Sequence, residues 1–323
     1  SSKIANSLIN AIKNGKKVTV LVELQARFDE ENNIYWANKL QEEGARVIFG
    51  VPGLKVHSKL CLITTIESGK EFHYGHIGTG NFNEKTSRIY TDFSLLTANK
   101  EITSDLAKIF EFYENNFKVQ AFKHLVVAPF FMREQFTQLV NKEIKNAKSG
   151  IPSSIILKMN SLVDKGMIEK LYEANNAGVK IKLLIRGACS LVTGVEGWSE
   201  NIEAYSIVDK YLEHARVFIF HNGGDEKIFI SSADWMSRNL DNRSEVAVPI
   251  YSPEIRKQLK DIIAIQLSGN TKLRILDAKQ ENQYRKPKPG EKKIRVQDEV
   301  YNYLKKEKEA SHKPHKQKQT VQS

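Results

Sequence analysis

The stretch that decides the fold is HSKLCLI at residues 57–63, because a stretch of the same kind, HARVFIF, returns at residues 214–220. In each, a histidine and a cation two residues later stand at the start of an apolar run that predicts a strand. Turn signals follow both runs, with ESGK at residues 67–70 predicting a hairpin and NGG at residues 222–224 predicting a turn. The chain therefore holds two copies of one local pattern, and this internal repeat guides the interpretation of the rest.

The two copies stay in step beyond these turns. The first continues as HIGTGNFN at residues 76–83 and the second as FISSADW at residues 229–235, each a strand-like run that enters a turn of small residues. An acidic residue inside an apolar strand comes next, Asp92 in the first copy and Glu245 in the second. The acid stands at the same interval from the turn in both copies, as a duplication predicts.

Upstream of each copy the pattern predicts a strand, a helix and a second strand. The first copy has them at residues 18–23, 34–40 and 45–49, and the second at residues 155–159, 167–174 and 179–185. Gly44 and Gly178 stand where each helix should end. Two such units predict an α/β fold duplicated within the chain, with a pseudo-twofold relation and a site between the units.

Further amphipathic patterns predict helices that flank the units. They lie at residues 102–117, 133–147 and 253–267. We place the domain boundary near residue 124, ahead of the break at Ala128-Pro129. The predicted organisation is a first unit at residues 1–124, a second at residues 125–270 and a basic, flexible tail at residues 271–323.

Composition excludes several classes of protein. The 323 residues are 41% hydrophobic and 27% charged, which is ordinary for a globular protein, and no run approaches the ~20 apolar residues that span a bilayer. Cys61 and Cys189 lie singly in strand-like runs, so neither a disulfide scaffold nor a zinc ribbon is expected. The chain opens in an amphipathic helix with no charged region ahead of an apolar one. We expect a cytoplasmic fragment of a longer chain, with membrane association left open.

The net charge of +11 is concentrated in the tail. Residues 271–323 carry 15 Lys or Arg against 7 Asp or Glu, a surplus of +8, whereas the other 270 residues carry only +3. KPKPGEKK at residues 286–293 and HKPHKQK at residues 312–318 are too polar to bury a core of their own. We expect a solvated appendage with a short helix around residues 297–308, and favour a solubilising extension over a polyanion-binding arm.

His57 and Lys59 carry the clearest chemical signal. Residues two apart in a strand point to the same face, so the imidazole and the ammonium would lie side by side. The cation lowers the pKa of the imidazole, which keeps a nitrogen free to attack, and it attracts a phosphoryl anion. A single H-x-K pattern is weak, because a histidine at a strand start is more often a packed or surface residue. Its recurrence at His214, with Asn81 and Asp234 in the turns that follow, favours a phosphate-handling site.

This constellation resembles the phospholipase D superfamily, which uses one H-x-K motif from each of two repeats, followed by a Gly/Ser-x-Asn turn and an acidic residue. The second copy departs from that pattern, because Arg216 replaces the lysine and Asp234 the asparagine. The chain is more similar to the large polyphosphate kinases that work through a phosphohistidine, whose C-terminal half consists of two phospholipase D-like domains. The similar runs span residues 1 to about 270 and include GLKVHSK (53–59), HIGTGNFNEK (76–85), YTD (90–92), IRG (185–187), LEH (212–214), SSADW (231–235) and DNR (241–243).

The resemblance implies a reaction and its main residues. His57 would take the γ-phosphoryl group of ATP and pass it to the end of a polyphosphate chain, while His214 would assist the leaving or attacking phosphate as a general acid or base. Arg186 matches a family position that contacts the nucleotide phosphates, and Tyr90 matches the adenine-stacking position. Arg27 matches a position of the magnesium site. Since a guanidinium cannot ligate a cation, we expect Arg27 to bind phosphate oxygens next to Mg²⁺.

Other residues receive supporting roles. Asp92 and Glu245 would each fix the tautomer and rotamer of one histidine. His73, His124 and His221 are expected to be structural or surface residues. A phosphate-binding wall would be formed by Lys59, His76, Asn81, Asn83, Lys85 and Arg88, with the alternative that the asparagines only shape the turn and that Lys85 and Arg88 are only solvated.

The same resemblance implies what the chain works with. Members of this family have additional domains upstream, so the chain alone is expected to bind ATP poorly or not to turn over. The expected substrates are ATP, ADP and polyphosphate with Mg²⁺, and the full-length protein is expected to be a homo-oligomer without a nucleic-acid partner or an integral membrane segment. A phospholipase D-like phosphodiesterase or nuclease, and a non-enzymatic polyanion-binding module acting through the tail, stay open as alternatives.

Overall fold

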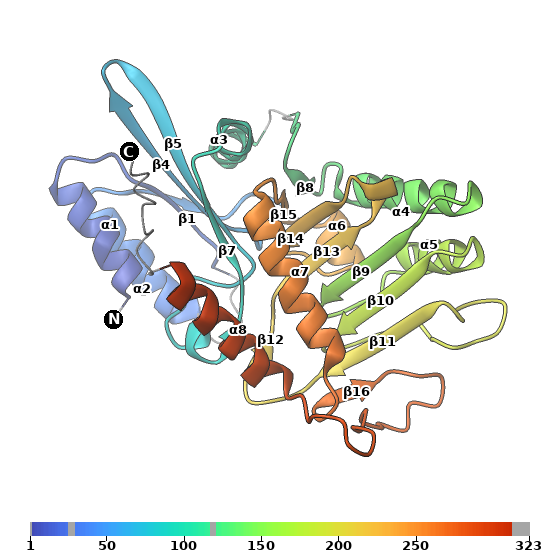
Figure 1. Ribbon diagram of the computed structural model, residues 1–323. Coiled ribbons are helices and arrows are strands. Elements are labelled where there is room, and N and C mark those ends of the chain that lie inside the picture. The colour runs from blue at the N-terminus through green and yellow to red at the C-terminus, as the bar shows by residue number, and fades with distance from the viewer. Residues whose placement is uncertain (1, 25–29, 117–120, 312–323) are drawn as a thin grey trace, which may run out of the picture.

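The computed structural model describes residues 2–24, 30–116 and 121–311 (Figure 1). Arg27 lies outside the described residues. Within those ranges no helix is both long enough and apolar enough to cross a membrane.

The first unit combines small sheets with three helices. Its elements are α1 (Lys3–Lys13), β1 (Thr19–Val22), α2 (Glu30–Glu42), β2 (Arg46–Phe49), β3 (Lys55–Val56), β4 (Lys59–Glu67), β5 (Lys70–Gly78), a 3₁₀ turn (Thr86–Arg88), β6 (Tyr90–Thr91), β7 (Ser94–Thr97) and α3 (Lys100–Glu114). β1 and β2 pair in parallel, and β4, β5 and β7 form an antiparallel sheet. The β4–β5 hairpin turns at Ser68-Gly69, where both residues have positive φ, as the ESGK signal predicts. Asn99 caps the N-terminus of α3, and its side chain accepts hydrogen bonds from the first-turn N–H groups of Glu101 and Ile102.

The second unit is built on a larger sheet. Its elements are β8 (Val126–Ala128), α4 (Met132–Lys148), β9 (Ser154–Met159), α5 (Lys165–Asn176), β10 (Lys180–Ile185), β11 (Ile202–Ile207), β12 (Leu212–Glu213), β13 (Arg216–Phe220), a 3₁₀ turn (Asn222–Gly224), β14 (Lys227–Ser231), α6 (Ser237–Asp241), β15 (Arg243–Pro249) and α7 (Pro253–Ser268). The order along the sheet is β16-β11-β10-β9-β13-β14-β15-β3, where β16 is Leu273–Ile275 and β8 also pairs with β15. β9, β10 and β11 are parallel.

Helices cover both faces of this sheet, with α4 and α5 on one face and α7 on the other (Figure 1). The alternation along β13 shows how the sequence produces this layering. Phe218 and Phe220 pack in the core with α4 and α5, whereas Val217 and Ile219 pack in the core that α7 and α3 share. A strand that is apolar on both faces is buried on both, so HARVFIF folds as a central strand.

Two short parallel pairings join the units reciprocally. β3 of the first unit pairs with β15 of the second, and β12 of the second unit pairs with β6 of the first. The two units thus exchange equivalent strands, which confirms the duplicated α/β architecture expected from the repeat. Because β3 and β12 each end one residue before a histidine, both histidines lie at the junction of the units.

The structure differs from the sequence-based expectations at two places. Glu245 lies inside β15, but Asp92 lies in the connection between β6 and β7 rather than inside a strand. The basic tail is also more integrated than its composition predicts, because Leu273 adds β16 to the sheet and Val296 is 1% exposed at the start of α8 (Val296–Ser311). A few apolar residues among many charges are enough to attach residues 271–311 to the second unit. The helix expected around residues 297–308 is confirmed.

Candidate active site

His57 is held at the junction by a carboxylate of the other unit. Its Nδ1 lies 2.9 Å from the Glu245 carboxylate, and because a carboxylate only accepts, Nδ1 carries the proton. Glu245 is fully buried, whereas 26% of the His57 side chain is exposed. Ser232 and Asn239 also donate hydrogen bonds to the Glu245 carboxylate. The Nε2 atom of His57 has no hydrogen-bond partner among the described residues, so its lone pair is free.

His214 is held in the mirrored way. Its Nδ1 lies 2.8 Å from Oδ1 of Asp92, which belongs to the first unit. Thr79 donates to the same carboxylate oxygen at 2.6 Å, in the place that Ser232 takes beside Glu245. The sequence predicts one carboxylate for each histidine, and the structure brings them together as crossed pairs.

The backbone explains why the pairs cross. The N–H groups of His57 and Ser58 both donate to the carbonyl of Ser244 at 3.0 Å, one residue before Glu245. The N–H groups of His214 and Ala215 donate to the carbonyl of Thr91, one residue before Asp92, at 3.2 and 2.9 Å. Each histidine is therefore positioned through the backbone and the side chain of the opposite unit, so neither unit forms this site alone.

The basic residue two positions after each histidine turns back toward it. Lys59 donates to the carbonyl of His57, and Arg216 donates to the carbonyl of His214 at 2.8 Å. Arg216 also lies 3.2 Å from Nε2 of His214 and 3.2 Å from the Asp234 carboxylate. The same Nη1 atom lies 3.4 Å from Nδ1 of His214, so the guanidinium lies over the face of the imidazole and does not bond the in-plane lone pair of Nε2. The two histidines are thus not equivalent, because Arg216 covers one face of the His214 ring and the His214 side chain is 13% exposed, against 26% for His57.

Burial and the paired cations set the protonation states. Burial lowers the pKa of His57 and of His214 below 6.5, and Lys59 and Arg216 lower both further, while Glu245 and Asp92 act in the opposite direction. Burial also lowers the pKa of Lys59 to about 7, since its side chain is almost completely enclosed. Both imidazoles are therefore neutral at pH 7, and Lys59 is close to its titration point.

Arg186 and Tyr90 lie beside His214. The Tyr90 ring is 5.0 Å from the imidazole of His214, and Nε of Arg186 donates to Asn160 at 2.9 Å. Asn160 in turn donates to the carbonyl of His214 at 3.3 Å, so one amide links the arginine to the histidine. Burial lowers the pKa of Arg186, with Tyr90 and Asp234 among the groups that counter it. Asn160 carries no repeat signal, and the sequence analysis did not identify it.

The residues expected to form a phosphate-binding wall differ in their surroundings. The His76 ring packs against Phe82 with centroids 5.0 Å apart and the ring planes tilted by 42°, and its buried Nδ1 has no hydrogen-bond partner among the described residues. Asn83 instead caps the 3₁₀ turn, because its side chain accepts from the N–H groups of Lys85 and Thr86 at 3.0 and 3.1 Å. That contact matches the turn-shaping alternative for Asn83. Asn81, Lys85 and Arg88 are exposed.

The three histidines set aside in the sequence analysis lie outside this cluster. His73 bonds Thr64 across the β4–β5 hairpin at 2.9 Å, and His124 bonds Tyr251 at 2.9 Å. His221 begins the 3₁₀ turn after β13. The partners of His73 and His124 agree with structural or surface roles, whereas the buried Nδ1 of His221 has no hydrogen-bond partner among the described residues.

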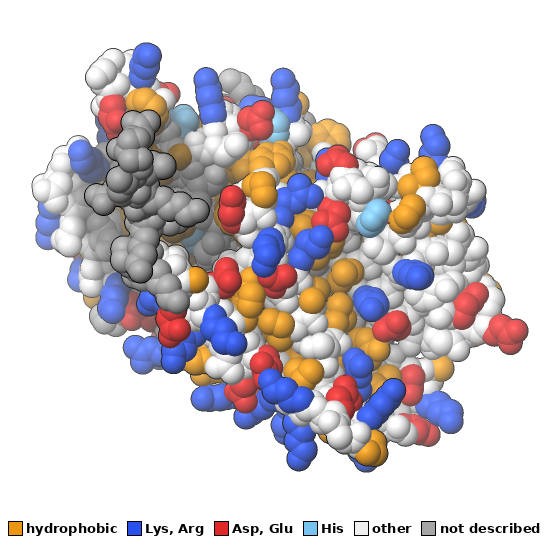
Figure 2. Space-filling view, viewed as in Figure 1, with side chains coloured by type: hydrophobic (Ala, Val, Ile, Leu, Met, Phe, Trp, Pro, Cys, Tyr) orange, Lys and Arg blue, Asp and Glu red, His pale blue; other side chains and the backbone are white. Residues whose placement is uncertain are grey.

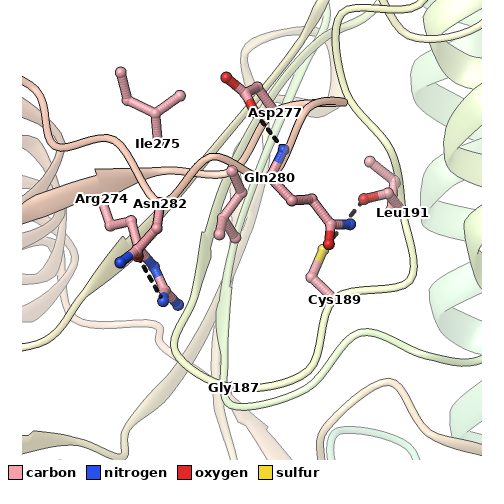
Figure 3. Close-up of a pocket in the computed structure, with 9 residues that line it drawn as sticks. Gly187, Cys189, Leu191, Arg274, Ile275, Asp277, Gln280 and Asn282 are labelled. Atoms are coloured by element: carbon pink, nitrogen blue, oxygen red, sulfur yellow. Dashed lines mark hydrogen bonds between the residues drawn. The ribbon is translucent and has the colours of Figure 1, made fainter.

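A pocket of about 270 Å³ opens next to Arg186, where the segment after β10 meets the segment after β16 (Figure 3). Arg274 bonds Asn282 at 3.1 Å on one side, and the Gln280 backbone bonds Asp277 at 2.8 Å on the other. Its lining includes Gly187 but neither paired histidine. The pocket is therefore separate from the two-histidine site.

Charge on the outer surface is mixed. Figure 2 shows Lys and Arg over α7 and α8 interspersed with Asp and Glu. Lys257 pairs with Asp261, Lys260 with Glu226 and Lys292 with Glu299. Of these three lysines, only Lys292 lies in the basic tail.

No cluster of three or more His, Cys, Asp or Glu side chains able to hold a metal ion occurs among the described residues. Asp92 and Glu245 are each engaged by a histidine. The described residues thus offer no carboxylate cage for magnesium.

One histidine, one basic residue and one carboxylate from each of two repeats meet at a shared, partly buried site. This arrangement defines a class of duplicated α/β proteins suited to handling phosphate groups.

Comparison with known proteins identifies the family. Residues 1–119 match the family model for polyphosphate kinase C-terminal domain 1, and residues 125–297 match the model for C-terminal domain 2. The chain belongs to the polyphosphate kinase family. It is 52% identical over 304 residues to the polyphosphate kinase of Escherichia coli K12, covering 94% of this chain and 44% of that protein. It is 51% identical over 319 residues to the polyphosphate kinase of Vibrio cholerae, covering 99% and 45%.

A solved structure agrees with this assignment. The crystal structure of polyphosphate kinase from Porphyromonas gingivalis aligns with a TM-score of 0.89 and 43% identity, over 96% of this chain and 47% of that one. The chain thus spans less than half the length of these relatives.

Proposed function

We propose that this chain is the phosphoryl-transfer part of a polyphosphate kinase, with His57 as the residue that carries the phosphoryl group between ATP and polyphosphate. The observation that carries the proposal is the inequality of the two histidines. Both are neutral at pH 7, but the His57 side chain is 26% exposed, whereas the His214 side chain is 13% exposed and has the Arg216 guanidinium over its ring. His57 therefore presents the more accessible Nε2 lone pair to a phosphorus atom.

The transfer proceeds in two displacements at one phosphorus atom. Nε2 of His57 attacks the γ-phosphorus of ATP, a P–N bond forms, and ADP leaves with the electron pair of the broken P–O bond. A terminal oxygen of polyphosphate then attacks the same phosphorus, and the P–N bond breaks to return the lone pair to Nε2. Glu245 accepts the Nδ1–H bond throughout and stabilises the positive charge that develops on the ring.

Positive charge and positioning supply most of the catalysis, because phosphoryl transfer needs little other covalent help. Lys59 and Arg186 lie at the site and are proposed to bind phosphoryl oxygens, with His76 and Asn81 as further members of this wall. Tyr90 is proposed to stack on the adenine. His214 is proposed to exchange a proton with the leaving or attacking phosphate, with Asp92 orienting its ring.

Magnesium is assigned to the substrate, as Mg-ATP, because the described residues form no acidic cage for it. Arg27, outside the described residues, is proposed to contact phosphate oxygens beside the ion. We further propose that the full-length protein works in the cytoplasm as a homo-oligomer. Since the relatives are more than twice as long, part of the nucleotide pocket is proposed to come from the upstream half, so the chain alone should bind ATP weakly.

The test is intact mass spectrometry at basic pH after incubation with Mg-ATP or with polyphosphate, because a phosphohistidine is lost in acid. We expect one added phosphoryl group, which is absent from His57→Ala and retained by His73→Ala, a matched histidine variant on the hairpin. Where the chain alone gives no adduct, the upstream half of the Escherichia coli relative is added. A second absence would overturn the proposal and favour a diester-cleaving or binding role.

A further inference from the structure

The segment of residues 292–297, called the strap below, lies along the strand that leads to His214. Arg295 pairs with the buried carboxylate of Asp209 at 2.6 Å. The Gln297 amide accepts from the N–H of Tyr211 at 3.0 Å and donates to the carbonyl of Tyr211 at 2.8 Å. The same amide donates to the Glu213 carboxylate at 2.9 Å. The strap therefore contacts Asp209, Tyr211 and Glu213, which are alternate residues of the segment that leads to His214.

The strap is anchored to the body of the second unit. Val296 is buried against Gly269, where an added Cβ would lie only 2.5 Å from Cγ1 of Val296. Asn270 bonds the backbone of Lys292 and of Ile294. Figure 1 shows α8 continuing from this anchor beside α7. The first turn of α8 is therefore fixed relative to the sheet and can hold β12 in place.

The Glu213 carboxylate is where hydrogen bonds from the strap and from other elements meet. Its side chain is 4% exposed and accepts hydrogen bonds from four elements. The donors are Lys158 of β9 at 2.7 Å, Thr91 of β6 at 3.1 Å, Gln266 of α7 at 3.1 Å and Gln297 of α8 at 2.9 Å. A buried carboxylate with this many fitted donors holds its position closely, since each lost bond leaves buried charge less compensated.

Glu213 connects to both members of the second histidine pair. Glu213 directly precedes His214 in the chain, and its carboxylate accepts a hydrogen bond from the Thr91 hydroxyl. Thr91 directly precedes Asp92, and its backbone carbonyl accepts from the N–H of His214. The first histidine pair has a different support, because the Tyr113 hydroxyl bonds Ser58 at 2.7 Å and Ser244 at 2.6 Å, and these contacts do not involve the strap. The strap should thus act on His214 and not on His57.

We propose that Gln297 is a positioning residue for His214, which holds the Glu213–Thr91 junction so that the imidazole keeps its Nδ1–H bond to Asp92. The inference rests on the proposed role of His214 in the site, but its test needs no turnover. In this proposal, the C-terminal segment positions a residue of the site and is not only a solubilising extension.

The test is the tautomer of each histidine, read from side-chain ¹⁵N shifts at pH 8 without substrate. Signals are assigned with His214→Gln and His57→Gln. Gln297→Met removes the amide at similar volume, and Asn302→Met makes the same kind of change at an exposed position of α8. Thermal unfolding checks that each variant is folded.

We expect the Nδ1–H form to dominate at both histidines in the parent chain and in Asn302→Met. In Gln297→Met, His214 should lose that preference and populate the Nε2–H form, while His57 keeps its own. An unchanged His214, an equal change at both histidines, or a parent chain without the Nδ1–H form at His214 would each overturn the proposal. None of these results depends on whether the chain transfers phosphate, so they are distinct from a failure of the proposed function.

Discussion

Replacing Lys59 with methionine should make the chain more stable and less able to transfer phosphate. The Lys59 side chain is almost completely enclosed, and burial lowers its pKa from 10.5 to about 7. Its ammonium donates to the backbone carbonyl of His57 and forms no ion pair within the described ranges. Below pH 7 the lysine is charged in both the folded and the unfolded chain, so the whole difference in pKa acts against folding.

The size of the effect follows from this shift. About 3.5 pH units correspond to about 5 kcal/mol at 1.36 kcal/mol per unit. The pKa of about 7 already includes the attraction of Glu245, but methionine leaves the His57 carbonyl without the donor that Lys59 supplies, at a cost of about 1–3 kcal/mol. We therefore expect a net gain in unfolding free energy of about 2 kcal/mol for Lys59→Met at pH 6.

The pH dependence makes the reasoning refutable. Above pH 7 the folded chain binds one proton fewer than the unfolded chain, so the stability of the parent rises relative to the variant up to pH 10.5. Urea unfolding of both proteins at pH 6, 7.5 and 9 should show the gain shrinking by about 1.4 kcal/mol per pH unit above pH 7. A Lys59→Met chain that is less stable than the parent at pH 6, or a difference that does not change with pH, would refute the account of Lys59.

The other predictions concern the histidine pairs and the nucleotide. Glu245→Gln should keep the fold and reduce phosphohistidine formation by at least about 100-fold, because Nδ1 loses a charged acceptor; stopped incubations followed by intact mass measure the rate. Asp92→Asn should lower the pKa of His214 further, because the Asp92 carboxylate raises it; an NMR titration that shows a higher pKa would be inconsistent with the pairing. Tyr90→Ala should weaken Mg-ATP binding by about fivefold, the loss of ~1 kcal/mol of stacking, while Tyr90→Phe binds as the parent does in calorimetry.

The repeat made much of the architecture predictable. HSKLCLI and HARVFIF are local patterns, and their strands, the hairpin after the first and the helices between them depend on short-range periodicity. The sequence predicted that each histidine would pair with one carboxylate, but it did not predict which carboxylate pairs with which histidine. His57 meets Glu245 only because β3 pairs with β15, a contact between residues 188 positions apart that no local pattern specifies.

Other features depend on long-range contacts in the same way. From the sequence alone, a glutamate such as Glu213 is expected at the surface. It is buried here because four side chains from distant parts of the chain donate hydrogen bonds to its carboxylate: Lys158, Thr91, Gln266 and Gln297. The tail was expected to be solvated because its mean composition is polar, yet attachment needed only a few apolar residues such as Leu273 and Val296. Average composition describes how much surface can be buried, not where single residues attach.

The central claim is that His57 carries the phosphoryl group, and a pulse–chase experiment tests it most directly. The chain is phosphorylated from polyphosphate, supplied with the upstream half of a relative where needed, freed of excess donor at basic pH and then given Mg-ADP. The account predicts that the adduct maps to His57 and disappears as an equal amount of ATP forms, while His57→Ala never acquires it. An adduct that maps to another residue, or one that persists in the presence of Mg-ADP, would contradict it.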